Sequence, residues 1–305
     1  MRPSISLAAF HERRRHQLRM DHVTKIYARG ARALDDVSLS LTPGLNCVIG
    51  AVGAGKSTLL NILSGRDRPD RGTVSFGAVD SGASPTLLRT ITAYVPIDTP
   101  VPPPVPVSVA IEHFAALREP AVRPPRRVNV EAQLRQLDLW HARTLRVGEL
   151  TPAMHWRLML AIALLGSPKV LVIDEPAGAL EDADLDAVMD LLETLAEERI
   201  VVFTTSNAHV IRDRCTHIVF MSRGRIVREG AADRVIDDFR GRVWTADVSR
   251  EAAPHLTDSH LVLSTRYSDD MVTVVVFAHE QPGSSFAPVE PDLTHVYLYD
   301  MIASS

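Results

Sequence analysis

The stretch GAVGAGKS, residues Gly50–Ser57, decides how the rest of the chain is organised. It fits the pattern G-x-x-x-x-G-K-[ST], in which glycines let the backbone curl so that successive N–H groups point at a phosphate. The apolar run LNCVI just before it is typical of a buried strand, and STLLNILSG, which starts at Ser57, is typical of a helix. A phosphate would then lie at the N-terminus of that helix, where free N–H groups and the helix dipole favour an anion. The alternative, a chance glycine-rich turn, leaves this strand–loop–helix context unexplained.

The residues of this loop have different expected roles. Lys56 would reach the β- and γ-phosphates, and the hydroxyl of Ser57 would bind Mg²⁺. The backbone that surrounds the phosphates is expected to come from Gly50, Ala51, Gly53, Ala54 and Gly55. ATP with Mg²⁺ is therefore the predicted ligand.

Composition limits the class of protein. The 305 residues are 46% hydrophobic and 23% charged, as in a globular protein with one large domain or a domain with an appendage. The net charge of −4 gives no reason to expect nucleic-acid binding, although residues 10–19 form a basic run. No apolar run approaches the ~20 residues that span a bilayer, so the chain is not expected to cross a membrane by itself. Cys47 and Cys215 are expected to be core thiols in a reducing compartment.

The order of patterns predicts an α/β fold. Alternating residues from Met20 predict antiparallel strands, and helical patterns follow at residues 107–118, 130–140 and from Thr151. Apolar strands then resume at 170–174 and 200–205, and a hairpin is expected at 217–230. We expect a P-loop core with an antiparallel β subdomain and a helical subdomain. Beyond residue 241, short alternating runs and a final amphipathic helix predict a small α+β appendage.

VLVIDEP, residues 170–176, provides the second chemical signal. A carboxylate at a strand end, Asp174, can hold the Mg²⁺ shell close to Ser57. Glu175 is placed to orient and activate a water that attacks the γ-phosphate. The alternative is a solvated acidic turn after a core strand, which the preceding P-loop makes less attractive.

With these two motifs the chain resembles the ATP-binding subunit of ABC transporters. The stretch VGELTPAMHWRLMLAIALLGSPKVLVIDEPAGALED, residues 147–182, is similar in order and spacing to that family's signature helix, Walker B strand and D-loop. The resemblance runs over residues 20–241, which predicts an N-terminal extension at 1–19 and an appendage at 242–305. The ending EPDLTHVYLY, residues 290–299, is similar to the tail of drug- and antibiotic-efflux ATPases that pair with a separate membrane subunit.

The resemblance implies further roles. Tyr27 occupies the position of an aromatic ring that stacks on adenine, for which an edge-strand tyrosine is the alternative. Thr58 would help to bind the α-phosphate. The signature loop, which in a family dimer contacts the nucleotide of the other subunit, is here LTPAM. Thr151 keeps a hydroxyl and Ala153 keeps its N–H, but Pro152 has none and stiffens the turn.

Other positions depart from the family's pattern. Ile97 replaces a glutamine that senses the γ-phosphate and couples the site to the membrane subunit. Ser206 replaces a histidine that holds the γ-phosphate and the catalytic water, and it offers a hydroxyl without charge. Glu181 replaces the D-loop aspartate. Since losing one transition-state donor costs on the order of 10²–10³ in rate, slow hydrolysis is expected.

The leading hypothesis is therefore the ATP-binding subunit of an ABC exporter, peripheral at the cytoplasmic face of a membrane. Its implied partners are a separate transmembrane permease and a second ATP-binding subunit, identical or different. The alternative hypothesis is a catalytically degenerate, ATP-gated module that pairs with a competent cassette. A soluble ABC protein of DNA repair or translation is disfavoured, because the chain carries one cassette and no long coiled coil.

Overall fold

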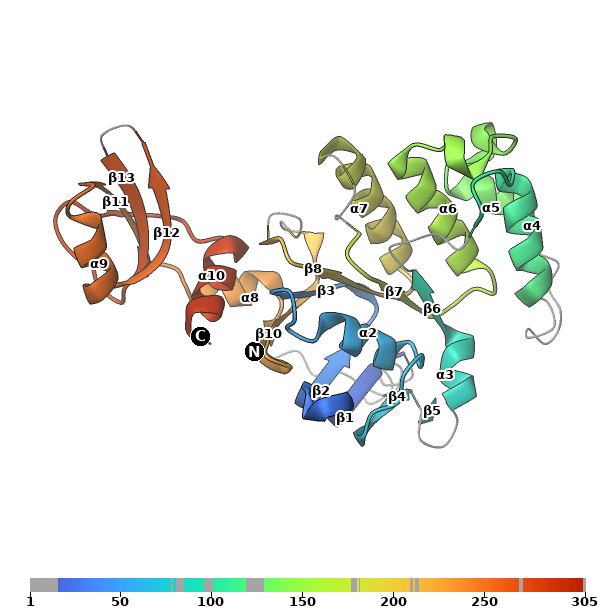
Figure 1. The fold of residues 1–305 in the computed structure, drawn as a ribbon, viewed down its shortest axis with the longest axis horizontal. Coiled ribbons are helices and arrows are strands. Elements are labelled where there is room, and N and C mark those ends of the chain that lie inside the picture. The colour runs from blue at the N-terminus through green and yellow to red at the C-terminus, as the bar shows by residue number, and fades with distance from the viewer. Residues whose placement is uncertain are drawn as a thin grey trace, which may run out of the picture.

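The structure is a computed structural model. It describes residues 16–77, 79–80, 85–95, 101–118, 129–176, 180, 182–208, 211, 214–268 and 271–303. Figure 1 shows a central sheet with an antiparallel sheet below it, a group of helices on one side and a small domain on the other.

The central sheet has the strand order β10-β9-β3-β8-β7-β6. Its members are β3 (Gly44–Gly50), β6 (Thr92–Val95), β7 (Val170–Ile173), β8 (Ile200–Thr205), β9 (His217–Ser222) and β10 (Arg225–Gly230). All neighbours pair in parallel except β9 and β10, which form a hairpin. Every residue of β3, β7 and β8 is buried, which explains why these strands are apolar runs without alternation.

The second sheet is antiparallel and has the order β2-β1-β4-β5. It consists of β1 (Leu18–Ile26), β2 (Arg32–Leu41), β4 (Arg71–Phe76) and β5 (Val79–Asp80), with a short 3-10 helix at Ala28–Gly30. The strand β1 starts at Leu18, within the expected N-terminal extension, because Leu18 already belongs to the buried face with Met20. Helix α2 (Lys56–Leu63) packs between this sheet and the central one.

Helices cover the other face of the central sheet. They are α4 (Val107–Arg118), α5 (Val130–Gln136), α6 (Pro152–Leu164) and α7 (Asp182–Ala196), with 3-10 turns at Trp140–Ala142 and Val147–Glu149; α3 (Pro85–Ile91) precedes β6. Helix α5 is shorter than the expected 130–140. Asp138 adopts a φ of 51°, outside the helical region, so the helix cannot continue to Trp140.

The C-terminal residues form the expected α+β appendage. After α8 (Ala232–Asp237) come β11 (Val243–Ser249), α9 (Ala253–Ser259), β12 (Leu261–Tyr267), β13 (Met271–Phe277), β14 (Ala287–Pro288) and α10 (Leu293–Ala303). The strands pair antiparallel in the order β12-β13-β11-β14, and they enclose a small core with α9. Helix α10 returns to the central sheet, where it contacts α8, β3 and β9.

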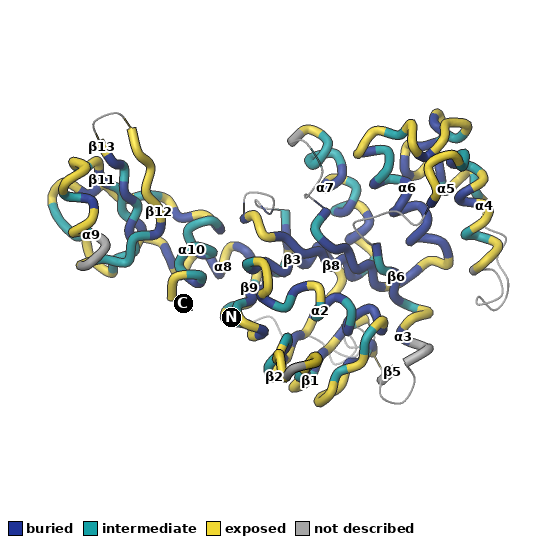
Figure 2. The backbone as a smooth tube through the Cα atoms, viewed as in Figure 1, coloured by how far each residue is buried: buried dark blue, intermediate teal, exposed yellow. Residues whose placement is uncertain are grey.

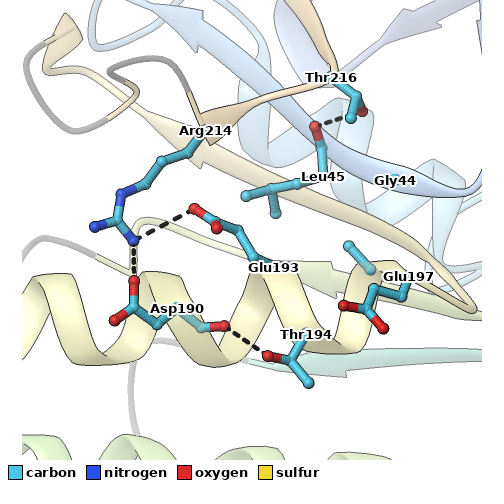
Figure 3. A pocket seen from close by; sticks show the side chains of 9 residues that line it. Gly44, Leu45, Asp190, Glu193, Thr194, Glu197, Arg214 and Thr216 are labelled. Atoms are coloured by element: carbon cyan, nitrogen blue, oxygen red, sulfur yellow. Dashed lines mark hydrogen bonds and ion pairs between the residues drawn. The ribbon is translucent and has the colours of Figure 1, made fainter.

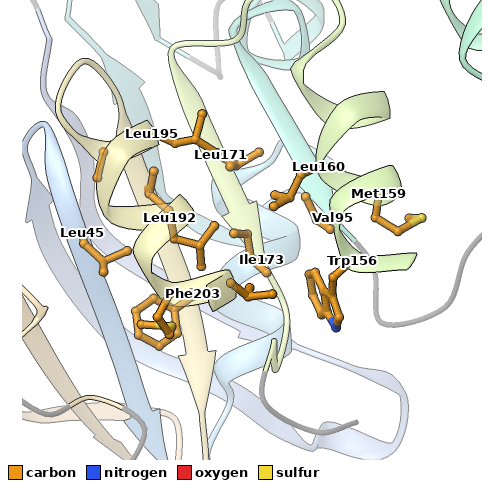
Figure 4. Packing of buried hydrophobic residues seen from close by; sticks show 14 of the residues in the cluster. Leu45, Val95, Trp156, Met159, Leu160, Leu171, Ile173, Leu192, Leu195 and Phe203 are labelled. Carbon is orange, nitrogen blue, oxygen red and sulfur yellow. The ribbon is translucent and has the colours of Figure 1, made fainter. Parts of the chain in front are cut away.

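The main core lies between the central sheet and the helices. Figure 2 shows the buried strands of this sheet as the inner layer of the molecule. Figure 4 shows Leu192 and Leu195 of α7 and Leu160 of α6 packed against Leu171 and Ile173 of β7. Cys47 and Cys215 are buried free thiols, as expected. Among the described helices, none has the length and apolarity that crossing a bilayer requires. The predicted P-loop fold is confirmed.

Candidate functional site

The P-loop joins the end of β3 to the start of α2. Gly53 and Gly55 adopt φ values of 84° and 103°, which side chains other than glycine rarely permit. At Gly50 a Cβ would lie 2.4 Å from the carbonyl oxygen of Met221, so a side chain cannot fit between β3 and β9. The carbonyl of Ala54 accepts the Gly224 N–H at 2.9 Å. This contact anchors the loop to the β9–β10 hairpin.

Lys56 connects the P-loop to the second motif. Its ammonium donates to the carbonyl oxygens of Gly50 at 2.8 Å and Ala51 at 3.2 Å, and its side chain is 7% exposed. The same Nζ lies 3.4 Å from Oε1 of Glu175. The carboxyl ends of parallel strands meet at one edge of a sheet, so β3 and β7 deliver these residues to one place. A lysine so placed can exchange the loop carbonyls for phosphate oxygens.

Asp174 is a buried carboxylate with two hydroxyl partners. Thr204 donates to Oδ1 at 2.8 Å, and Tyr94 donates to Oδ2 at 3.2 Å. Burial, together with the Asp174 charge, raises the pKa of Tyr94 to about 12, so its phenol stays a donor at neutral pH. These bonds fix the direction of the carboxylate and compensate for the cost of burying it.

Glu175 adopts a φ of 46°, which is uncommon for a residue other than glycine. Its N–H donates to the hydroxyl of Thr204 at 3.0 Å, the same hydroxyl that donates to Asp174. The side chain is 26% exposed. Thr204 thus binds the carboxylate of Asp174 and the backbone of Glu175, while the Glu175 carboxylate reaches Lys56 of the P-loop.

The donor set fits Mg²⁺. Ser57 is exposed at the start of α2, and Asp174 supplies a carboxylate at the sheet edge. Mg²⁺ prefers oxygen ligands and is usually held by one or two protein groups, water and substrate phosphates. Two protein oxygens beside a phosphate-binding loop match that preference.

Tyr27 lies just after β1 and is 42% exposed. Its hydroxyl donates to Oδ2 of Asp67 at 3.1 Å, and the ammonium of Lys25 lies 5.4 Å from its ring centroid. The hydrogen bond from Lys25 lowers the pKa of Asp67. The ring is therefore held by its hydroxyl at the edge of the antiparallel sheet. Stacking on adenine stays a prediction.

The remaining predicted positions are distributed differently. Ser206 is exposed directly after β8, and Thr58 is half-buried in α2. Thr151 is the N-cap of α6 and accepts the Met154 N–H at 3.3 Å; Pro152 is exposed in the first turn, and Ala153 is buried. Among the described residues no hydrogen bond or ion pair links this turn to the P-loop. Ile97 and Glu181 lie outside the described residues.

Two site residues escaped the sequence analysis, Tyr94 and Thr204. Both lie on strands that flank β7, and the register places Tyr94 opposite Val172. The polar pair Thr204–Thr205 at the end of the otherwise apolar strand β8 was a usable signal, because buried hydroxyls need partners. Tyr94 gave no comparable signal.

A separate groove opens at the amino ends of the strands (Figure 3). It is lined by Gly44, Leu45, Thr216 and residues of α7, and has a volume of about 520 Å³. Arg214 crosses it and pairs with Asp190 at 2.5 Å and with Glu193 at 3.3 Å. Since β3 has seven residues at ~3.3 Å each, this groove lies roughly 20 Å from the P-loop. The ion pairs of Arg214 with Asp190 and Glu193 attach the segment before β9 to α7.

Known proteins with similar sequences include ATP-binding proteins of transporters. Residues 34–178 match the protein-family model described as ABC transporter. Over 194 residues the chain is 33% identical to the ABC transporter ATP-binding/permease protein Rv1747 of Mycobacterium tuberculosis. The matched region is 63% of this chain and 22% of that protein. Over 266 residues it is 25% identical to the phosphonates import ATP-binding protein PhnC of Bdellovibrio bacteriovorus, with 78% of this chain and 97% of that protein covered.

The fold is similar to that of solved cassettes. The dimeric, post-hydrolysis structure of the ATP-binding cassette MJ0796 with ADP and Pi matches with a TM-score of 0.61 and 24% identity, over 70% of this chain and 98% of that one. The ADP conformation of the cassette MJ1267 matches with a TM-score of 0.62 and 22% identity, over 73% of this chain and 93% of that one. The ADP and Pi held by MJ0796 are the products of ATP hydrolysis. Residues 34–178 are therefore similar in sequence to an ABC transporter domain, and the chain is similar in fold to solved ATP-binding cassettes.

Proposed function

We propose that this chain is the ATP-binding subunit of an ABC exporter, with slow hydrolysis. It would bind Mg-ATP, dimerise around the nucleotide and drive a separate transmembrane permease from the inner face of the membrane. Rv1747 is named an ATP-binding/permease protein and PhnC an import protein, so the relatives' names support transport without favouring a direction. The export direction rests on the resemblance of the final helix to efflux ATPases.

The observation that carries the proposal is the meeting of three charged side chains at one sheet edge. Lys56 contacts Glu175 at 3.4 Å, and Thr204 links Glu175 to Asp174. With Mg-ATP present, Lys56 would hold the phosphates, and Ser57 and Asp174 would hold the metal ion. The metal ion would neutralise charge on the phosphates. Glu175, no longer paired with Lys56, would orient a water and accept its proton.

Slow turnover is proposed from Ser206. Ser206 is exposed after β8, at the position where the resemblance implies a histidine that holds the γ-phosphate, and its side chain offers one short hydroxyl without charge. One missing transition-state donor costs ~3–4 kcal/mol, and two such losses are not additive.

Contacts at the signature turn favour a second candidate function. Thr151 uses its hydroxyl to cap α6, and Pro152 has no N–H to offer a nucleotide bound by another subunit. Such a turn would contact the nucleotide of a second subunit only weakly. The chain would therefore work best in an asymmetric pair. This candidate is a nucleotide-gated module that pairs with a competent cassette.

Nucleotide binding and turnover by the purified chain test the proposal together. Mg-ATP binding is measured by calorimetry, turnover by phosphate release, and self-association by size exclusion with and without ATP. Glu175→Gln is the control, because it keeps the shape of the side chain and removes the base. If the chain is an exporter subunit, it should bind Mg-ATP and hydrolyse it, and Glu175→Gln should abolish the hydrolysis. Binding with turnover equal to that of Glu175→Gln favours the gated module, and no binding at millimolar ATP excludes both.

A further inference from the structure

The end of strand β1 lies beside the P-loop. Lys25 of β1 pairs with Leu34 of β2 in the sheet register. A Cβ on Gly55 would lie 3.2 Å from Cδ2 of Leu34 and 2.5 Å from the carbonyl oxygen of Ala33, so β2 packs directly on the loop. Tyr27 follows Lys25 by two residues, which is roughly 7 Å along an extended chain. A nucleotide whose phosphates occupy the P-loop can therefore extend its base to this end of the antiparallel sheet.

The hydroxyl of Tyr27 is anchored on the segment that follows α2. It donates to Oδ2 of Asp67 at 3.1 Å, while the ammonium of Lys25 donates to Oδ1 at 2.8 Å. The N–H of Arg68 donates to the same Oδ1 at 2.7 Å. Asp67 thus has one carboxylate oxygen that fixes its own position and a second that holds the tyrosine.

Lys25 makes this anchor rigid. It is 9% exposed, and its ammonium also donates to the carbonyl oxygen of Arg68 at 2.8 Å. The hydrogen bond to Asp67 raises the pKa of Lys25, which keeps the ammonium charged. The N–H of Ile26 donates to Oδ2 of Asp70 at 2.6 Å, a further bond between β1 and the same segment. The carboxylate that holds Tyr27 is therefore fixed from both sides.

The anchored ring can offer one face to a ligand. The ammonium of Lys25 lies over the ring, 5.4 Å from its centroid, within the range of a cation–π contact. Tyr27 is nevertheless 42% exposed, so a planar group can stack on the opposite face. Bases stack readily on aromatic side chains, because every base has a π face. Stacking on a surface side chain costs the freedom of that side chain, and the bond to Asp67 removes this cost in advance.

We propose that Asp67 and Lys25 are positioning residues, which fix the ring of Tyr27 for stacking on the base of the bound nucleotide. This inference rests on the proposed function, in which the chain binds Mg-ATP. Two parts of one element then act on different parts of the ligand. The P-loop at the start of α2 binds the phosphates, and the segment after α2 sets the affinity for the base through Tyr27.

Tyr27→Phe tests the anchor, because it keeps the ring and removes the hydroxyl. Two probes separate the base from the phosphates. They are Mg-ATP, with its Kd measured by calorimetry, and Mg-tripolyphosphate, with its inhibition constant measured in competition with Mg-ATP. We expect Tyr27→Phe to raise the Kd for Mg-ATP about three- to tenfold, as for one side chain that must be immobilised on binding. The inhibition constant of tripolyphosphate and the melting temperature should not change. Tyr267→Phe, at an exposed tyrosine of the appendage, is the matched control and should change none of the three quantities.

A double-mutant cycle separates positioning from a structural role. Asp67→Ala should raise the Kd for Mg-ATP as much as Tyr27→Phe does, and the two together should raise it no more than either one alone. Asp67→Ala also leaves the buried ammonium of Lys25 without its carboxylate, so it should lower the melting temperature. If this variant does not fold, Tyr27→Phe and the two probes decide.

Three results overturn the inference and leave the proposed function intact. They are an unchanged Kd for Mg-ATP in Tyr27→Phe, an equal change in the inhibition constant of tripolyphosphate, and additive effects in the cycle. Failure of the wild type to bind Mg-ATP overturns both the inference and the proposed function.

Discussion

Thr204→Val is the substitution that tests most directly how the two acids of the site are held. Valine has nearly the shape of threonine, but it removes a hydroxyl that is fully buried between Asp174 and Glu175. The hydrogen bond to the Asp174 carboxylate, 2.8 Å long, is of the charge-assisted kind worth ~1.5–3 kcal/mol. The Glu175 N–H loses its acceptor at 3.0 Å, which costs ~1–3 kcal/mol where water cannot replace it.

These losses are partly offset. Tyr94 still donates to Asp174, and Glu175 lies close enough to solvent for some rehydration of its N–H. We therefore expect Thr204→Val to lower the free energy of unfolding by about 2–4 kcal/mol. Glu175 would also lose the contact that holds its uncommon backbone conformation, so kcat should fall at least tenfold, to the level set by a misplaced base.

Thr204→Ser is the matched control. It keeps the hydroxyl and removes one buried methyl group, at a cost of about 1 kcal/mol. Urea denaturation followed by tryptophan fluorescence measures stability, and phosphate release measures kcat. If Thr204→Val were as stable and as active as Thr204→Ser, the hydroxyl would not be the element that positions the two acids.

Three further predictions concern other parts of the molecule. Ser206→His should raise kcat about tenfold or more by restoring a transition-state donor, and an unchanged rate in phosphate-release assays would mean that another step limits turnover. Asp300→Asn removes the charge that pairs with Arg228, and it should lower the free energy of unfolding by about 1–3 kcal/mol in urea titrations. This is less than the ~3–5 kcal/mol of a fully buried pair, because Arg228 is a quarter exposed. An unchanged free energy of unfolding would show that this ion pair contributes nothing. Because burial and a nearby carboxylate raise the pKa of Tyr94 to about 12, its unfolded phenol ionises first near pH ~10. The stability of the wild type relative to Tyr94→Phe should thus be constant below pH ~10 and fall toward pH ~12, and melting temperatures that differ equally at all pH values would contradict this.

Much of the fold was predictable because its local signals agree. The P-loop pattern, the apolar run ending in Asp174 and the helix start at Thr151–Pro152 each predict the element that the structure contains. The hairpin turn is a clear case. Arg223 and Gly224 both adopt positive φ values, 50° and 78°, as a two-residue hairpin turn requires.

The parts that were missed depend on tertiary contacts. Helix α9 is seven residues long and is stabilised by packing on the small core of the appendage, so its sequence carries little helical periodicity. Thr204 and Tyr94 acquire their roles from the register of β8 and β6 against β7, which a single sequence does not contain. Tyr297 was expected only as part of an apolar helix face, because its place beside Ile49 and Met221 depends on how α10 docks.

The steady-state hydrolysis of Mg-ATP, measured beside Mg-ATP binding for the wild type and Glu175→Gln, tests the central claim most directly. We expect both proteins to bind Mg-ATP with similar Kd values, because Lys56 and the P-loop are unchanged in the variant. The wild type should show a slow turnover, and Glu175→Gln should show none. Failure of the wild type to bind Mg-ATP, or equal turnover in the two proteins, would contradict the assignment of this site.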